Sequence, residues 1–297
     1  MGGQTNSKFS IFKLTFGLAL IGTVGAAVVG TGLDAITIVF WRSVIGAVFL
    51  AVWCFATGIL PDRSLTLRNI LLGSVAGISL VLSWAAFFEG ILLTSISTAT
   101  IIFHIQPFLI VLISAAIYKD KITRNQMLWL AAAFIGVILA SNLSLSGSTN
   151  DSWLTGILIL FGGAFLYAIT AVAGKGLSGQ RGEITTLIQT VAGSLIFLPF
   201  VNFSIDISLH AWGWLLMIGV VQTGIGWVLV YSAYPHVPTP LMAALSFVNP
   251  LTAILSDWLF FGHLITLAQA IGMALIVLGT LGVKLGWGLN MFTRPQR

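Results

Sequence analysis

The chain has 297 residues, of which 58% are hydrophobic and only 7% are charged, and its mean hydropathy is +1.05. Soluble domains carry roughly 25% charged residues, so this composition excludes a water-soluble surface and indicates a protein surrounded by lipid. The net charge of +5 comes from basic residues scattered among short polar stretches, whereas a nucleic-acid partner would require them clustered on one face.

Ten apolar segments follow one another along the chain. Each is long enough, or nearly so, to cross ~30 Å of hydrocarbon as a helix. We predict spans at Phe12–Gly32, Ile36–Leu60, Ile70–Leu92, Thr98–Ile117, Met127–Leu143, Trp153–Gly174, Thr185–Val201, Trp212–Tyr231, Leu241–Phe261 and Ala268–Leu285. Lys8 and Lys13 before the first segment also fit a signal peptide, but nine further apolar segments follow, so we interpret it as a retained span.

The basic residues predict the orientation of these spans. If the N-terminus is cytoplasmic, every Lys and Arg except Arg42 falls on the cytoplasmic side, in a loop, in a tail or at the cytoplasmic end of a span. Cytoplasmic loops are enriched in these residues, so both termini are expected in the cytoplasm and the number of spans is expected to be even. The predicted location is the inner membrane of a cell, with membrane lipid as the surrounding partner.

The two halves of the chain are similar to each other at an offset of 143 residues (250 − 107). The offset matches Pro107 with Pro250, Trp84 with Trp227, Gln126 with Gln269, and Gly136 with Gly279. Residues 1–145 and 151–290 then form two five-helix repeats, followed by a short tail at 291–297. Because five is odd, the second repeat enters the membrane inverted. The predicted fold is therefore an all-α integral membrane protein of ten transmembrane helices in two inverted repeats, a plan that many secondary transporters use around a midplane site.

Each half contains the same order of residues: a mid-helix proline, a polar turn, and then Gln and Gly in the next helix. These are Pro107, Asp120, Gln126 and Gly136, and then Pro250, His263, Gln269 and Gly279. In this order, and in Arg42 of the second segment, the chain resembles the EamA-like branch of the drug/metabolite transporter superfamily. The family usually has Glu where Asp120 and His263 stand, in turns that we expect to be structural. The resemblance implies a ten-helix carrier, usually an exporter in bacteria, whose substrates vary from amino acids to drugs.

Away from the cytoplasmic ends of the predicted spans, three ionised side chains lie inside them: Arg42, Glu89 and Asp257. A charge at the centre of a membrane helix costs ~2.5–3.5 kcal/mol on insertion scales and is a functional-site hypothesis by default. Arg42 either binds a substrate carboxylate with its planar guanidinium or pairs with Glu89 or Asp257 to hold helices together. Glu89 and Asp257 are candidates for proton coupling, since partial burial raises a carboxyl pKa. The alternative for Glu89 is that it reaches the nearby interface.

Polar residues flank two mid-span prolines, His104 and Gln106 before Pro107 and Asn249 before Pro250. Proline frees a backbone carbonyl one turn earlier and bends the helix. We therefore predict structural bends at both prolines and place the three polar side chains among the residues lining a substrate cavity. The alternative for His104 is a hydrogen bond to a neighbouring helix.

Further cavity candidates are the repeat-related Trp84 and Trp227, together with Tyr167 and Gln222. A mid-membrane Trp either stacks on a substrate or packs in the core, and the sequence leaves both open.

No short catalytic motif is present, and the single Cys54 and four His residues show no metal-ligand spacing. We expect no enzyme activity, no cofactor and no metal. The predicted function is a secondary transporter, an exporter, that moves a small-molecule substrate such as an amino acid by alternating access around a midplane cavity. The alternatives are a carrier of another solute class (drug, nucleotide or sugar derivative) and a non-transporting scaffold subunit. A monomer and a homodimer are both compatible with the sequence.

Overall fold

The computed structural model describes residues 2–60, 65–94, 96–141, 151–177, 179–262 and 264–288. Within these ranges the chain forms helices and connecting loops, without a β-strand. The helices are α1 (Gly2–Gly22), α2 (Val24–Thr31), α3 (Ala35–Ala56), α4 (Leu67–Leu93), α5 (Ile96–Phe103), α6 (Gln106–Tyr118), α7 (Arg124–Ala140), α8 (Asp151–Lys175), α9 (Gly182–Phe197), α10 (Leu209–Leu216), the π-helix η1 (Met217–Gly226), α11 (Trp227–Ala233), the 3₁₀-helix η2 (Tyr234–His236), α12 (Thr239–Leu245), α13 (Val248–Phe261) and α14 (Leu267–Leu285).

Seven helical stretches among the described residues are long and apolar enough to cross a membrane, and α7 and α9 are shorter apolar helices. Their outer surfaces are apolar as well. On α3, for example, Val48, Val52 and Phe55 are 59%, 64% and 73% exposed. Such an apolar stripe at helical spacing faces lipid in a membrane protein, because exposing so much apolar surface to water is unfavourable.

Each predicted span coincides with one helix or with consecutive helices, and four spans are broken. Two of the breaks lie next to the prolines at which bends are predicted: α6 begins one residue before Pro107, and α13 begins two residues before Pro250. A proline in the first turn of a helix is tolerated because its missing N–H would be unpaired there anyway. The break between α1 and α2 at Thr23 and the ten-residue π-helix η1 were not expected from the sequence.

The helices α7 and α14 begin in the same way. Thr123 and Gln126 form a capping box at the start of α7, and Thr266 and Gln269 form one at the start of α14. In a capping box the Thr hydroxyl and the Gln side chain satisfy two backbone N–H groups that a helix start leaves unpaired. The repeated Gln residues of the sequence pattern are thus helix caps.

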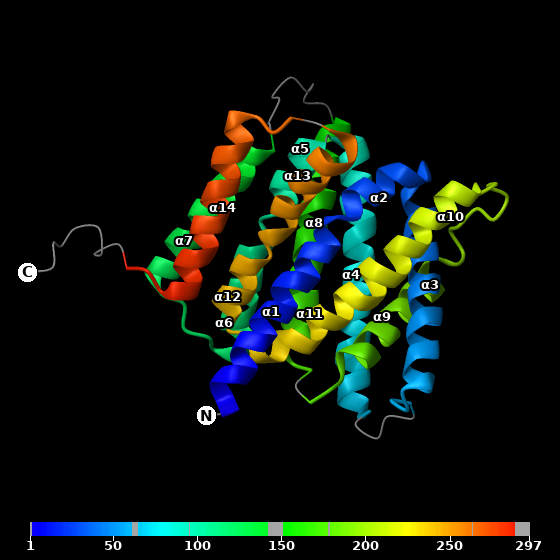
Figure 1. Ribbon diagram of the computed structural model, residues 1–297, viewed down its shortest axis with the longest axis horizontal. Helices are drawn as coiled ribbons and strands as arrows, with labels where there is room; N and C mark the ends of the chain where they lie inside the picture. The colour runs from blue at the N-terminus through cyan, green and yellow to red at the C-terminus, as the bar shows by residue number, and fades with distance from the viewer. Residues whose placement is uncertain are drawn as a thin grey trace, which may run out of the picture.

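The helices pack in pairs, as Figure 1 shows: α4 lies along α8, α7 along α14, and α3 along α9. Interhelical hydrogen bonds from Ser83 to the Gly163 carbonyl (2.8 Å) and from Thr170 to the Ala76 carbonyl (3.1 Å) join α4 to α8. Small residues allow the close approach between α7 and α14, where a Cβ on Gly136 would lie 2.6 Å from a backbone oxygen. Close contact of this kind drives helix association in membranes.

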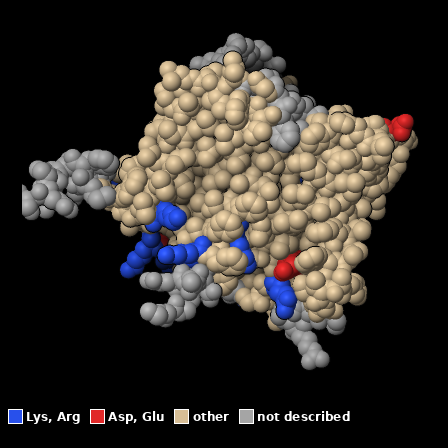
Figure 2. Space-filling model, viewed as in Figure 1, with Lys and Arg blue, Asp and Glu red and all other residues tan. Residues whose placement is uncertain are grey.

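Lys and Arg side chains gather at one end of the molecule (Figure 2), the end at which α1 begins and α14 finishes (Figure 1). We call this the basic end. On the face that Figure 2 shows, the described basic side chains therefore lie toward one end of the helices.

Candidate functional site

Arg42, on α3, is buried in the middle of the bundle and is only 2% exposed. Its Nε donates a hydrogen bond of 3.0 Å to the Thr223 hydroxyl of η1. Its guanidinium carbon lies 3.6 Å from the ring centroid of Trp84 on α4, a cation–π contact. Among the described side chains Arg42 has no acidic partner within salt-bridge distance, so the buried cation is held by a hydroxyl and an aromatic face.

Glu89 and Asp257 were the two acidic partners considered for Arg42, and the structure describes only the Glu89 side chain. Glu89, near the end of α4, lies on the outer surface of the helix bundle. The side chain of Asp257, and the whole of His263, lie outside the described residues.

Four aromatic side chains continue the site from Trp84 toward the basic end. Trp84 contacts Trp227 of α11 with ring centroids 6.0 Å apart, and Trp227 contacts both Tyr167 of α8 (6.2 Å) and Tyr231 (5.4 Å). Tyr231 in turn meets Tyr234 edge to face at 6.0 Å. We refer to Arg42, Thr223 and these five aromatic residues together as the central cluster. All seven are buried.

Polar residues at the two helix breaks lie near the same level of the bundle. His104 Nδ1 lies 2.7 Å from the Thr100 carbonyl, which accepts a hydrogen bond when Nδ1 is protonated, and the imidazole stacks on Phe247 at 6.3 Å. Gln106 is buried. Asn249 lies beside the Tyr167 hydroxyl, although no hydrogen bond of ordinary geometry joins them. The structure therefore brings Asn249 to the central cluster.

Gln222, a cavity candidate from the sequence, is buried and contacts a helix break. It lies in η1 and its Nε2 donates a 2.9 Å hydrogen bond to Thr23 at the break between α1 and α2. This side chain ties η1 to a helix break, while its Oε1 remains unpaired among the described residues.

The interior contains many buried polar atoms without a hydrogen-bond partner among the described residues. They include Arg42 Nη2, His104 Nε2, Gln106 Oε1, Tyr167 Oη, both amide atoms of Gln189, Trp227 Nε1, Tyr231 Oη and Asn249 Oδ1. More than 90% of buried polar groups in proteins are paired, and an unpaired one calls for an explanation. Donors and acceptors around one guanidinium and several aromatic faces can bind a polar solute that carries an anionic group.

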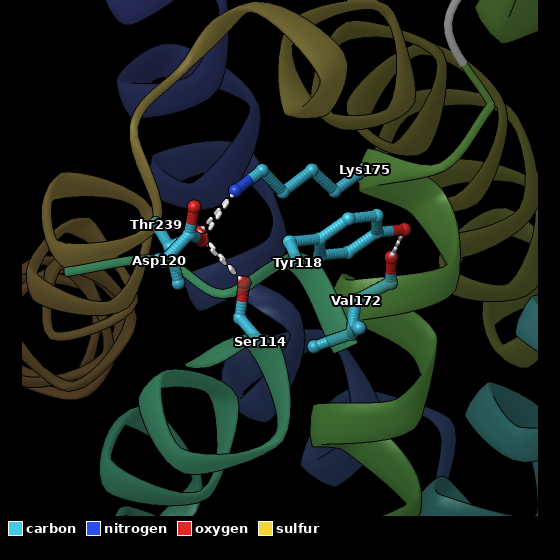
Figure 3. Close-up of polar contacts among 6 residues, drawn as sticks. All are labelled: Ser114, Tyr118, Asp120, Val172, Lys175 and Thr239. Carbon is cyan, nitrogen blue, oxygen red and sulfur yellow. Dashed lines mark hydrogen bonds and ion pairs between the residues drawn. The ribbon is translucent and has the colours of Figure 1, made fainter. Parts of the chain in front are cut away.

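A second polar group lies toward the basic end from the central cluster and joins α6, the turn after it, α8 and the start of α12 (Figure 3). Asp120 Oδ2 accepts hydrogen bonds from Lys175 Nζ (2.6 Å), Ser114 Oγ (2.6 Å) and Thr239 Oγ1 (2.5 Å). Lys175 Nζ also donates to Thr239 Oγ1 at 2.5 Å. We call these four residues the inner cluster. One turn away, the Tyr118 hydroxyl donates to the Val172 carbonyl at 3.0 Å (Figure 3).

The electrostatics of the inner cluster favour an ionised Asp120. Partial burial of the carboxyl raises the pKa of Asp120, but hydrogen bonds from Lys175, Ser114 and Thr239, with the charge of Lys175, outweigh burial and lower it to about 2. From the sequence, Asp120 is expected only in a turn, and Lys175 is one of the basic residues expected on the cytoplasmic side. No local pattern connects them, since 55 residues separate the two.

Comparison with known proteins identifies the chain. Residues 9–142 and 154–285 each match the model of the EamA-like transporter family. A crystal structure is similar over 94% of this chain and 99% of its own, with a TM-score of 0.82 and 17% sequence identity. The uncharacterized transporter YxxF of Bacillus subtilis is 26% identical over 91% of this chain and 88% of its own.

Two relatives carry names that state a solute. The pseudopaline exporter CntI of Pseudomonas aeruginosa is 26% identical over 85% of this chain and 87% of its own. The threonine/homoserine exporter RhtA of Escherichia coli is 24% identical over 53% of this chain and 54% of its own. The chain therefore belongs to the EamA-like transporter family and is a multi-pass membrane transporter, not an enzyme.

Proposed function

We propose that the protein is a secondary transporter that exports a small metabolite carrying a carboxylate, for example an amino acid. The observation that carries the proposal is the buried guanidinium of Arg42, which stacks on Trp84, has no acidic partner among the described residues and keeps Nη2 unpaired. A planar guanidinium matches a carboxylate with two parallel hydrogen bonds. The exporter names of CntI and RhtA support the direction of transport.

The substrate site in this proposal is the central cluster with the polar residues of the two helix breaks. Arg42 binds the carboxylate, Trp84, Trp227 and Tyr167 surround the rest of the solute, and His104, Gln106 and Asn249 supply polar contacts. Gln222 positions η1 through Thr23. Proton coupling by Asp257 stays a proposal, and Glu89 is the weaker candidate because it is exposed.

Transport by alternating access between two inverted five-helix repeats, with ten crossings in all, is part of the same proposal. Contacts between repeat-related residues support it. A Cβ on Gly136 would meet the Gly272 backbone oxygen at 2.6 Å and Ile276 N at 2.9 Å, while one on Gly279 would meet the Trp129 oxygen at 2.7 Å and Ala133 N at 2.8 Å. At the offset of 143 residues, Gly272 corresponds to Trp129 and Ile276 to Ala133, so the contact is reciprocal, as a two-fold relation requires.

Trp84 and Trp227 also correspond at this offset, and their rings are in contact at 6.0 Å. Equivalent residues that touch each other lie on the two-fold axis, which in an inverted repeat runs in the membrane midplane. The central cluster is then at the depth where a carrier holds its solute. The basic end faces the cytoplasm, the protein is an inner-membrane protein with both termini inside, and it acts as a monomer or homodimer.

A reconstituted transport assay tests this function. Purified protein in liposomes is offered labelled amino acids, other carboxylates, and a drug, a nucleotide and a sugar derivative, under proton and sodium gradients. We expect saturable movement of a carboxylate solute by the native protein and by a Lys121→Met control, whose exposed side chain lies in the turn after α6. Arg42→Met is expected to abolish the transport. If none of the solutes moves under either gradient, or Arg42→Met transports normally, the proposal is wrong.

A further inference from the structure

The inner cluster connects the two predicted repeats. Ser114 and Asp120 belong to the first repeat, and Lys175 and Thr239 belong to the second. Three donors converge on a single carboxylate oxygen (Figure 3), and hydrogen bonds to an ionised group are about twice as strong as neutral ones. The strongest polar link between the halves that the described residues show is therefore at one end of the bundle.

The inner cluster lies between the central cluster and the basic end. Ser114 is eight residues beyond Gln106 on α6 (114 − 106), which at a rise of 1.5 Å per residue is about 12 Å toward that end. On α8, Gly174 precedes Lys175, and a Cβ there would lie 2.6 Å from the Tyr234 ring and 3.2 Å from Tyr231. The end of α8 thus packs directly against the last aromatic residues of the central cluster.

We propose that Asp120, Lys175, Ser114 and Thr239 form the cytoplasmic gate of the transporter, closed in this structure. The inference rests on the proposed function, because it assigns the closed side of an alternating-access cycle. Opening toward the cytoplasm requires α6 with its following turn to move away from the end of α8 and the start of α12. That movement separates Asp120 from Lys175 and Thr239.

The ionisation of Asp120 and the contacts around Lys175 indicate how the gate opens. Asp120 stays ionised at every physiological pH, since its pKa is about 2, so the gate opens by helix movement and not by protonation of this carboxyl. Tyr118 adds a neutral link to Val172 one turn away, and the Lys175 ammonium lies 5.0 Å from the centroid of the Tyr118 ring. Lys175 thus contacts Asp120, Thr239 and the Tyr118 ring.

Cysteine accessibility tests the gate without a transported solute. A reporter cysteine at Gln106 is placed in a Cys54→Ala background, which removes the single native cysteine, and an impermeant maleimide is applied from the cytoplasmic side of inside-out vesicles. Lys175→Met removes one hydrogen bond from Asp120 and its neutralising charge. We expect labelling about ten- to hundredfold faster than with the gate intact. Lys121→Met is expected to leave the rate unchanged, and Lys175→Arg to restore most of the slow rate.

A cross-link closes the gate deliberately. Ser114 Oγ and Thr239 Oγ1 lie 2.9 Å apart, so cysteines at both positions are placed to form a disulfide. Oxidation is expected to stop cytoplasmic labelling of the reporter while labelling from the outside continues, and a reductant is expected to reverse the block. Equal labelling rates in Lys175→Met and native backgrounds, or rapid cytoplasmic labelling with the disulfide formed, would overturn the gate. Because neither readout needs transport, such a failure is distinct from a failure of the transport assay.

Discussion

Replacing Thr223 by Val removes the hydroxyl that accepts the hydrogen bond from Arg42 Nε and keeps the shape of the side chain. The bond is 3.0 Å long, both residues are buried, and the guanidinium has no acidic partner among the described residues. A hydrogen bond to a charged group contributes about 1.5–3 kcal/mol, and a buried donor left unpaired costs a similar amount. We therefore expect Thr223→Val to lower the free energy of unfolding by about 2 kcal/mol.

Double-mutant analysis isolates that contact. In Arg42→Met the cation that needs an acceptor is gone, so Thr223→Val is expected to cost little in that background, with a coupling of about 1.5–3 kcal/mol. Thr190→Val is the matched control, because the Thr190 hydroxyl bonds only to backbone carbonyls of its own helix and its loss has a small effect.

Cys54 makes the measurement simple. It is the single cysteine of the chain and is fully buried, so a thiol-reactive dye reports unfolding in mixed micelles without any added label. The reasoning about the buried cation is refuted if Thr223→Val is as stable as the native protein. It is also refuted if the two substitutions are additive within about 0.5 kcal/mol.

Three further predictions concern packing and charge. Gly136→Ala is expected to destabilise by about 1–3 kcal/mol, because its Cβ would lie 2.6 Å from the Gly272 backbone oxygen; Gly162→Ala, with nothing within 4 Å, is expected to be neutral or stabilising in the same unfolding assay. Glu89→Gln is expected to leave proton-driven uptake unchanged, since the side chain lies on the outer surface of the bundle and not in the central cluster, and loss of that uptake would contradict this. Because the pKa of Asp120 is lowered in the folded state, its ionised form stabilises the fold at neutral pH, and this stabilisation is lost as pH falls from about 4 to about 2. The difference in stability between the native protein and Asp120→Asn is therefore expected to shrink over that range. A constant difference would argue against the hydrogen bonds of Asp120 to Lys175, Ser114 and Thr239.

The sequence predicted the helices well because hydrophobic runs and prolines are local signals. The helix breaks at Pro107 and Pro250 are within a residue or two of their predicted places, and the repeated Gln126 and Gln269 turn out to be helix caps. The π-helix η1 was missed, since its extra residue per turn arises from packing and leaves no periodic mark in so apolar a stretch.

Polar contacts between residues far apart in the chain could not be predicted from the sequence. The sequence offered a substrate carboxylate, Glu89 or Asp257 as the partner of Arg42, and it gave no sign of the contacts with Thr223, 181 residues away, and with Trp84. Asp120 and Lys175 looked like ordinary loop charges. Which polar residues meet depends on how helices from the two halves rotate against each other, and helical periodicity is hard to read where nearly every position is apolar.

The central claim is that one buried site, built around Arg42 and Trp84, opens to each side of the membrane in turn. Counterflow in liposomes tests it most directly: vesicles preloaded with unlabelled solute are placed in a trace of the same solute carrying a label. Alternating access predicts that preloading accelerates entry of the label, that entry saturates with concentration, and that the oxidised Ser114→Cys/Thr239→Cys variant loses both effects. Entry that rises in proportion to concentration and ignores preloading would contradict the account.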